Sequence, residues 1–180
     1  NPQGVAIGTG TATGTINNDD TAPTISIGDV TVSEGNAGTT NFDFTVSLSA
    51  ASGVNASVTC TTADGTATTG DLDYVSKSAL ATIAAGSTST TFTVVVNGDT
   101  KYEANETFTV GLTGATGAII QTTPVGLTGV IIVTTPGTGT ITNDDTAPTV
   151  TLGLTGSPMA EAAGVGTVTA TLSAASGLPV

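Results

Sequence analysis

The sequence predicts an all-β fold, and three observations support this prediction. Thr and Val, whose branched Cβ atoms suit a pleated sheet, are abundant along the chain. Leu, Lys, Glu and Arg, the residues that usually fill helices, are scarce. Short runs of alternating apolar and polar residues are separated by Gly, Asn and Asp, which favour turns. Several such runs within one domain-sized stretch are typical of an antiparallel β-sandwich.

The expected strands follow one another at short intervals. The segments "NFDFTVSLS" and "TFTVVV" alternate most clearly, and turn signals such as Asp64-Gly65 and Asn97-Gly98-Asp99 separate the runs. Aromatic residues are few, so aliphatic side chains must fill most of the core. The expected strands are Thr24–Val32, Thr40–Leu48, Ala56–Ala63, Ser78–Ile83, Thr88–Val96, Thr107–Leu112, Ile119–Gln121, Val130–Thr134 and Thr138–Thr142.

The segment from Ala115 to Pro136 is unusually apolar and too long for a simple loop. We interpret it as an extra β-hairpin that packs on its own sandwich. The alternative is an intermolecular contact, because an exposed Ile-Ile or Val-Ile-Ile-Val edge would be an association site.

The chain contains an internal repeat of about 125 residues. "GTINNDDTAPTISI" at 14–27 returns as "GTITNDDTAPTVTL" at 139–152, and "LSAASG" at 48–53 returns at 172–177. We therefore predict the end of one repeat at 1–22, a complete domain at 23–146 and the first strands of another repeat at 147–180. Because neither end piece can bury a core alone, we expect a window on a longer chain, or pairing with neighbouring molecules.

The charge balance excludes several classes of partner and site. Two Lys+Arg residues stand against 14 Asp+Glu, with a formal net charge of -12 and no His. Nucleic acid and anionic membrane surfaces are poor partners because both require Lys and Arg.

No apolar run approaches the roughly 20 residues needed to span a bilayer. The single Cys60 alternates with Val58 on an expected strand, so we interpret it as a small buried hydrophobe.

The acidic residues lie mainly at turns and strand ends. Every second turn of an antiparallel sandwich lies at the same end, so several of these residues can converge there. Clustered carboxylates repel one another, and a divalent cation relieves this repulsion. Oxygen ligands favour calcium, with magnesium as a competitor, whereas zinc, copper and iron lack suitable ligands. The alternative is that each Asp simply forms a turn or, like Asp29 and Asp43, faces solvent.

Four segments, in this order, resemble the sequence signature of Calx-beta domains, the calcium-binding modules of sodium–calcium exchangers and of many large bacterial surface proteins. They are "VSEGNAG", "DGTATTGDLDY", "TFTVVVNGDTKYEANETFTVGL" and "GTGTITNDD". The resemblance implies an immunoglobulin-like sandwich of about seven strands with calcium at one end. The metal-ligating residues that it implies are Glu34, Asp64, Asp99, Glu103, Glu106, Asp144 and Asp145.

The sequence departs from this pattern at several positions. Asn143 precedes the terminal Asp pair where exchanger modules carry a third acid, and Gly98 and Thr100 flank Asp99 where acids can stand. We therefore expect fewer or more weakly held ions. Asp71 and Asp73 match an Asp-Tyr segment of the family only as a pattern, and we interpret Asp73 as structural.

The expected function is that of a calcium-binding tandem-repeat segment of an extracellular protein, such as an adhesin stalk or fibre on a bacterial surface. The Thr146-Ala147-Pro148 linker is short and lacks Gly, so calcium beside Asp144 and Asp145 would stiffen the junction between repeats. Its partners would be neighbouring repeats and, in a fibre, other copies. The alternative is a regulatory calcium sensor within a larger membrane or signalling protein. An enzyme is disfavoured because the chain has no His and no nucleophile–base arrangement.

Overall fold

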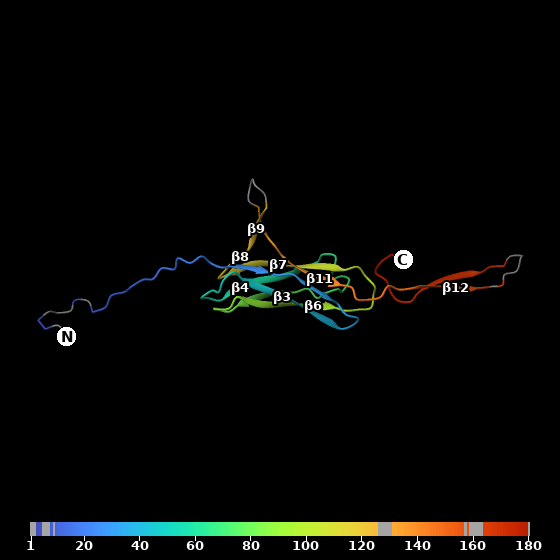
Figure 1. Cartoon of the computed structure of the whole chain (residues 1–180), viewed down its shortest axis with the longest axis horizontal. Coiled ribbons are helices and arrows are strands. Elements are labelled where there is room, and N and C mark those ends of the chain that lie inside the picture. Colours follow the sequence, from blue (N-terminus) through green and yellow to red (C-terminus); the bar gives the residue numbers. More distant parts are fainter. Residues whose placement is uncertain are drawn as a thin grey trace.

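The computed structural model describes residues 3–4, 8, 10–125, 131–156, 158 and 164–179. Within these residues every regular element is a β-strand, as the sequence predicts. An extended N-terminal segment leads into a central sandwich, and a separate two-stranded hairpin follows it at the opposite end (Figure 1). No helix in the described part of the chain is long and apolar enough to cross a bilayer.

Two sheets form the sandwich. The first contains, in spatial order, β6 (Ser89–Asn97), β3 (Thr39–Leu48), β1 (Thr24–Ile27) and β8 (Ile119–Ile120). The second contains β2 (Val30–Ser33), β11 (Gly137–Thr142), β7 (Glu106–Thr116), β4 (Ala56–Ala63) and β5 (Ser78–Ile83).

The core lies between the sheets because alternate residues of each strand point inward. Phe42, Phe44 and Val46 on β3 are fully buried, and the ring of Phe108 on β7 lies 5.9 Å from each of the two Phe rings. Cys60 is also fully buried, and burial raises the pKa of its thiol to about 11. The interpretation of Cys60 as a buried hydrophobe is confirmed.

The first expected strand is divided between the two sheets, which the sequence analysis did not predict. β1 pairs with β3, whereas β2 pairs in parallel with β11. Between them, the Gly28 N–H donates to the Thr45 carbonyl, and the Asp29 carboxylate accepts a hydrogen bond of 2.7 Å from the Thr138 N–H. Asp29 is therefore not merely a solvated strand residue: it fixes the crossover. With β1 and β2 counted as one divided strand, the sandwich has the expected seven strands plus the short β8.

The 115–136 segment forms a hairpin, as expected, but only its base packs on the sandwich. β8 pairs in parallel with β1, and Gln121 donates its N–H to the Ile25 carbonyl. β9 (Thr122–Val125) and β10 (Ile131–Thr134) pair with each other as a separate sheet that projects from the sandwich (Figure 1). The predicted packing on the sandwich is seen at the base, whereas β9 and β10 form backbone hydrogen bonds with each other and not with the sandwich strands. The tip at 126–130 lies outside the described residues.

The two end pieces differ in structure. Residues 10–23, most of the segment predicted to be the end of a preceding repeat, contain no strand and extend away from the sandwich (Figure 1). None of the described strands pairs with this segment, and an isolated strand has no backbone partners. At the other end, β12 (Val150–Thr155) and β13 (Thr167–Leu172) pair in antiparallel fashion with Val150 opposite Leu172. This register matches that of Ile25 opposite Leu48 in the complete domain.

Candidate metal centre

The acidic residues at the end of the sandwich meet because two strands run in parallel. β2 and β11 are paired with Ser33 opposite Thr142, so both strands end at the same edge of the sheet. Glu34 follows β2, while Asp144 and Asp145 follow β11 after Asn143. Our expectation of convergence assumed alternating antiparallel turns, and the structure instead achieves it through this parallel pair.

Glu34, Asp144 and Asp145 form the first group, which we call cluster A. Each offers a carboxylate oxygen, and these oxygens all lie within 4.8 Å of one another. Glu34 is only 6% exposed. Burial, together with the nearby charges of Asp99, Glu103, Asp145 and Asp144, raises the pKa of Glu34 to about 7. A buried carboxyl among other acids is poorly stabilised as an anion unless a cation accompanies it.

Asp145 offers an unsatisfied oxygen to cluster A. Its Oδ1 accepts a hydrogen bond of 2.6 Å from the Asn36 side chain, which fixes the orientation of the carboxylate. Its Oδ2 is buried and has no hydrogen-bond partner among the described residues. A buried polar atom without a partner requires an explanation, and an unsatisfied carboxylate oxygen is a suitable ligand for a hard cation. The residues of cluster A therefore fit calcium.

Asp73, Glu103 and Glu106 form a second group, cluster B, whose carboxylate oxygens also lie within 4.8 Å of one another. Burial, followed by the charge of Asp73, raises the pKa of Glu106 to about 7. The interpretation of Asp73 as structural is confirmed by a hydrogen bond, and the structure also places its carboxylate among possible metal ligands. Its Oδ2 accepts a hydrogen bond from the Thr68 N–H at 2.7 Å while it also faces the two glutamates. In the sequence, the signal that could have indicated a ligand role for Asp73 was its position next to Tyr74 in the family-like segment "GDLDY".

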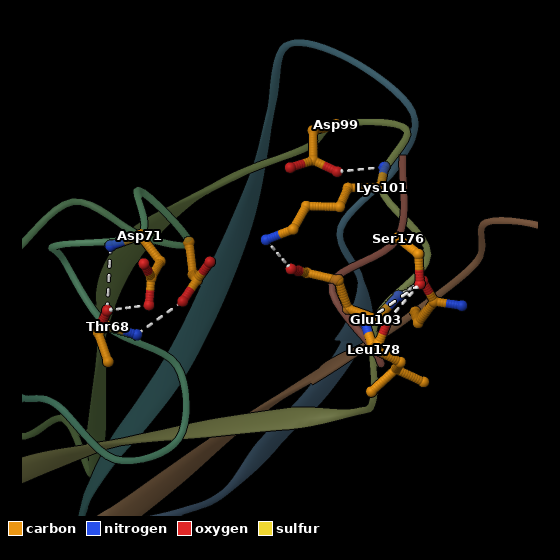
Figure 2. A network of polar contacts seen from close by, with 9 residues as sticks. Thr68, Asp71, Asp99, Lys101, Glu103, Ser176 and Leu178 are labelled. Atoms are coloured by element: carbon orange, nitrogen blue, oxygen red, sulfur yellow. Dashed lines mark hydrogen bonds and ion pairs between the residues drawn. The ribbon is translucent and has the colours of Figure 1, made fainter. Parts of the chain in front are cut away.

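Lys101 is the cation near these acids, and Figure 2 shows its side chain extending toward Glu103. The two residues form an ion pair, and this contact raises the pKa of Lys101. The chain's other lysine, Lys77, donates to the Thr93 carbonyl and lies over the Phe92 ring. One partly exposed lysine cannot balance two clusters of three carboxylates each, so the acidic end has an excess of negative charge.

Asp99 and Asp64 lie outside the two clusters. Asp99 is exposed and accepts a hydrogen bond of 2.7 Å from the Lys101 N–H, although its charge still acts on Glu34. Asp64 accepts hydrogen bonds from the Tyr74 hydroxyl at 2.6 Å and the Thr69 N–H at 3.1 Å, and these bonds lower its pKa. Through these hydrogen bonds Asp64 stabilises its loop. Its role as a metal ligand stays a prediction.

Two departures from the expected pattern have physical reasons. Asn143 accepts a hydrogen bond from the Glu103 N–H at 3.1 Å and donates to the Asp145 carbonyl at 3.1 Å, so its amide connects the two clusters. A carboxylate at 143 could not make the second bond. Gly98 lies against the strand-end backbone, where a Cβ would collide with the Gly35 carbonyl oxygen. An acidic side chain therefore has no room at position 98.

Comparison with known proteins identifies the family. The sequence model of the Calx-beta domain matches residues 17–135. The chain belongs to the Calx-beta domain family. The matched segment covers most of the complete domain predicted at 23–146, and it ends before β11 and the Asp144-Asp145 pair.

Solved structures of Calx domains resemble this one. A structure described as the apo-form Calx CBD1 domain is 25% identical, with a TM-score of 0.56, and the match covers 69% of this chain and all of that one. CBD12 from CALX1.2 is 26% identical, with a TM-score of 0.54 and coverages of 67% and 45%. CBD12 of CALX1.1, described as a calcium binding domain, is 26% identical, with a TM-score of 0.52 and coverages of 72% and 49%.

The matched part of this chain spans less than half the length of each CBD12 structure. No curated protein matches the chain. The comparisons support the fold and the family's calcium binding.

Proposed function

We propose that this Calx-beta domain binds calcium at the junction between tandem repeats and thereby stiffens the chain. The observation that carries this proposal is cluster A: Asp145 offers a buried oxygen, without a hydrogen-bond partner among the described residues, beside a buried Glu34. Glu34, Asp144 and Asp145 would hold one ion, and Asp73, Glu103 and Glu106 a second. The calcium would supply positive charge that balances these carboxylates.

The position of cluster A supports a mechanical role. Asp144 and Asp145 end the complete domain, and only Thr146, Ala147 and Pro148 precede the backbone hydrogen bond between Ser173 and Thr149 of the next unit. Fixing Asp145 against Glu34 would therefore restrict the hinge itself. The ring of Pro148 limits the hinge further by fixing its φ.

The proposed setting is an extracellular segment of a bacterial surface protein, such as an adhesin stalk or fibre. Extracellular calcium modules commonly bind at about 10⁻⁴–10⁻³ M, and partly solvated carboxylates suit this range. We assign the domain no catalytic role, because the chain has no His and its one thiol is buried with a raised pKa.

A regulatory sensor is the second candidate, favoured by the likeness to the CBD12 structures. In a sensor, calcium would alter the orientation of neighbouring domains to act on a partner. In a structural module, calcium would narrow the range of orientations between neighbouring domains and leave the mean orientation unchanged. Small-angle scattering of the chain with calcium and with chelator distinguishes the two: narrowing supports a structural module, and a new mean shape supports a sensor.

The calcium proposal is tested by thermal unfolding with calcium and with chelator. Calcium at 100 times its dissociation constant stabilises a folded state by about 2.7 kcal/mol, so the unfolding midpoint should rise. Asp144→Asn with Asp145→Asn should reduce this rise, because only the ion held by Asp73, Glu103 and Glu106 would remain. The matched control is Asp19→Asn with Asp20→Asn, which removes the same dipeptide from a segment outside both clusters and should preserve the rise. An unfolding midpoint that calcium leaves unchanged in the unmodified chain would contradict the proposal.

A further inference from the structure

The two copies of the LSAASG segment have the same local structure. In the first copy, Ser49 Oγ accepts a hydrogen bond of 2.9 Å from the Thr24 N–H, and in the second, Ser173 Oγ accepts one of 2.9 Å from the Thr149 N–H. The loops that follow also agree. The Val54 N–H donates to Ser52 Oγ at 3.2 Å, and the Leu178 N–H donates to Ser176 Oγ at 3.1 Å.

The second copy lies against the acidic loop of the complete domain. Tyr102 pairs with Ser176 as in a parallel sheet: its N–H donates to the Ala175 carbonyl at 3.4 Å, and its carbonyl accepts from the Gly177 N–H at 2.9 Å. Figure 2 shows Ser176 and Leu178 beside Glu103 in this contact.

Gly177 permits this close approach. A Cβ at Gly177 would lie 2.6 Å from Glu103 Oε1 and 3.0 Å from its Cγ. Since real Cβ atoms rarely come within 3.0 Å of another heavy atom, a larger residue there would force the side chains of Glu103 and Lys101 to move. The small residue of the motif is therefore matched to the acidic loop that it meets.

In the first copy, the backbone edge that corresponds to residues 175–177 has no paired segment among the described residues. No described residue forms a hydrogen bond with the Ala51 carbonyl or the Gly53 N–H, the equivalents of the groups that bind Tyr102. A Cβ at Gly53 would meet no atom of the described residues within 4 Å. A cavity of about 470 Å³ adjoins this edge, and its lining includes Ser52, Gly53, Asn18 and Asp20.

Asn18 lines this cavity, and it occupies the position in its repeat that Asn143 occupies in the complete domain. Its side chain donates to the Asp20 carbonyl at 3.5 Å, as that of Asn143 donates to the Asp145 carbonyl at 3.1 Å. Asn143 Oδ1 accepts the Glu103 N–H, and Asn18 Oδ1 has no equivalent donor among the described residues.

We propose that this cavity is the docking site for the acidic loop, Asp99–Glu103, of a preceding copy of the repeat. The Tyr102 equivalent would pair with Ala51 and Gly53, and the Glu103 equivalent would donate its N–H to Asn18. The proposal rests on the tandem-repeat part of the proposed function and does not require calcium. Docking of this kind would repeat the same contact along the chain. The LSAASG segment of each repeat would cover the loop with Asp99 and Glu103 in the preceding repeat.

A chain with one additional repeat tests this docking directly. Residues 1–146 followed by residues 22–180 preserve the native Asp-Asp-Thr-Ala-Pro junction and place an acidic loop ahead of the first LSAASG edge. Cysteines replace the upstream Glu103 (Glu103→Cys) and the downstream Gly53 (Gly53→Cys). Two Cβ atoms about 3.5–4.5 Å apart permit a disulfide. Oxidation should therefore cross-link this pair.

Two control pairs in the same chain make the result decisive. The downstream Glu103→Cys with Gly177→Cys reports the contact described above and should cross-link to a similar extent. The upstream Glu103→Cys with the downstream Leu80→Cys, at an exposed strand position, should not cross-link. Cross-linking at Gly177 without cross-linking at Gly53 would overturn the docking proposal. A Gly53 cross-link that forms equally in calcium and in chelator supports docking even if calcium leaves the unfolding midpoint unchanged, so the two proposals can fail separately.

Discussion

Glu34 and Asp145 lie near opposite ends of the domain sequence, and their carboxylate oxygens come within 4.8 Å of each other at one end of the sandwich. Glu34 is buried, and Oδ2 of Asp145 is buried without a hydrogen-bond partner in the described part of the chain. Such an arrangement costs free energy in the absence of a cation. The calcium-free domain is therefore destabilised by the residues proposed to bind the ion.

This destabilisation predicts an unusual pH dependence in chelator. The pKa of Glu34 is about 7 in the folded domain against an ordinary value of 4.5, so the folded state retains a proton that the unfolded state releases between these values. The free energy of unfolding should therefore fall as the pH rises from about 4.5 to about 7 and level off above 7, with a total loss of up to about 3 kcal/mol for one such group. Glu106 acts in the same direction.

The measurement is urea unfolding at pH 5 and pH 7.5 in chelator. The lowered pKa of Asp64 affects stability only below its ordinary value of 3.8, outside this range. Glu34→Gln should reduce the difference between the two pH values, because the amide has no proton to lose. Equal pH dependence in the variant and the unmodified domain would show that Glu34 is not the group responsible.

Gly98→Asp should weaken the domain rather than add a calcium ligand. A Cβ at position 98 collides with the Gly35 carbonyl oxygen, and overpacking of this kind typically costs about 1–3 kcal/mol. Thr100→Asp introduces the same charge at an exposed position in the same loop and should leave stability in chelator nearly unchanged. Urea unfolding of both variants checks the prediction, and tighter calcium binding by Gly98→Asp would refute it.

Leu72 is a site where substitution should stabilise the domain. Its φ is 70°, in the left-handed region that side chains other than Gly and Asn rarely adopt, and its side chain is 70% exposed. Leu72→Asn should raise the free energy of unfolding by roughly 0.5–1 kcal/mol, whereas Leu72→Val should lower it because a β-branched residue fits this region poorly. Thermal unfolding of the three proteins should give the order Asn, Leu, Val from highest to lowest midpoint.

Asp64 and Tyr74 should stabilise the loop between β4 and β5 independently of calcium. Tyr74→Phe removes the 2.6 Å hydrogen bond to Asp64, and loss of such a bond typically costs about 1 kcal/mol. Asp64→Asn should also lower the unfolding midpoint, while the rise caused by calcium should match that of the unmodified domain. A calcium titration of Asp64→Asn that shows a lost ion would instead restore its predicted ligand role.

The sequence predicts most strands but not the crossover that places Glu34. Alternation in "NFDFTVSLS" and "TFTVVV" is a local property, and the strands β3 and β6 agree with it to within a residue or two at each end. The division of Thr24–Val32 at Gly28 depends on a hydrogen bond from Thr138, far along the chain. Local patterning carries no information about such a contact.

Cluster B shows the same limit for the site. Asp73 stands in a loop with ordinary turn residues, and its approach to Glu103 and Glu106 follows from the packing of two segments that lie far apart in the sequence. Conversely, the repeated Asp-Asp pair was visible because a second copy of the sequence lies in the same chain. Repetition indicated which acids to consider, and only the fold shows which of them meet.

A crystal structure of the domain grown with calcium tests the central claim most directly. The account predicts an ion at cluster A, identified by its anomalous scattering, with carboxylate oxygens of Glu34 and Asp145 at about 2.3–2.6 Å. Saturating calcium with no ion at cluster A, and with Asp145 Oδ2 still lacking a partner, would contradict it.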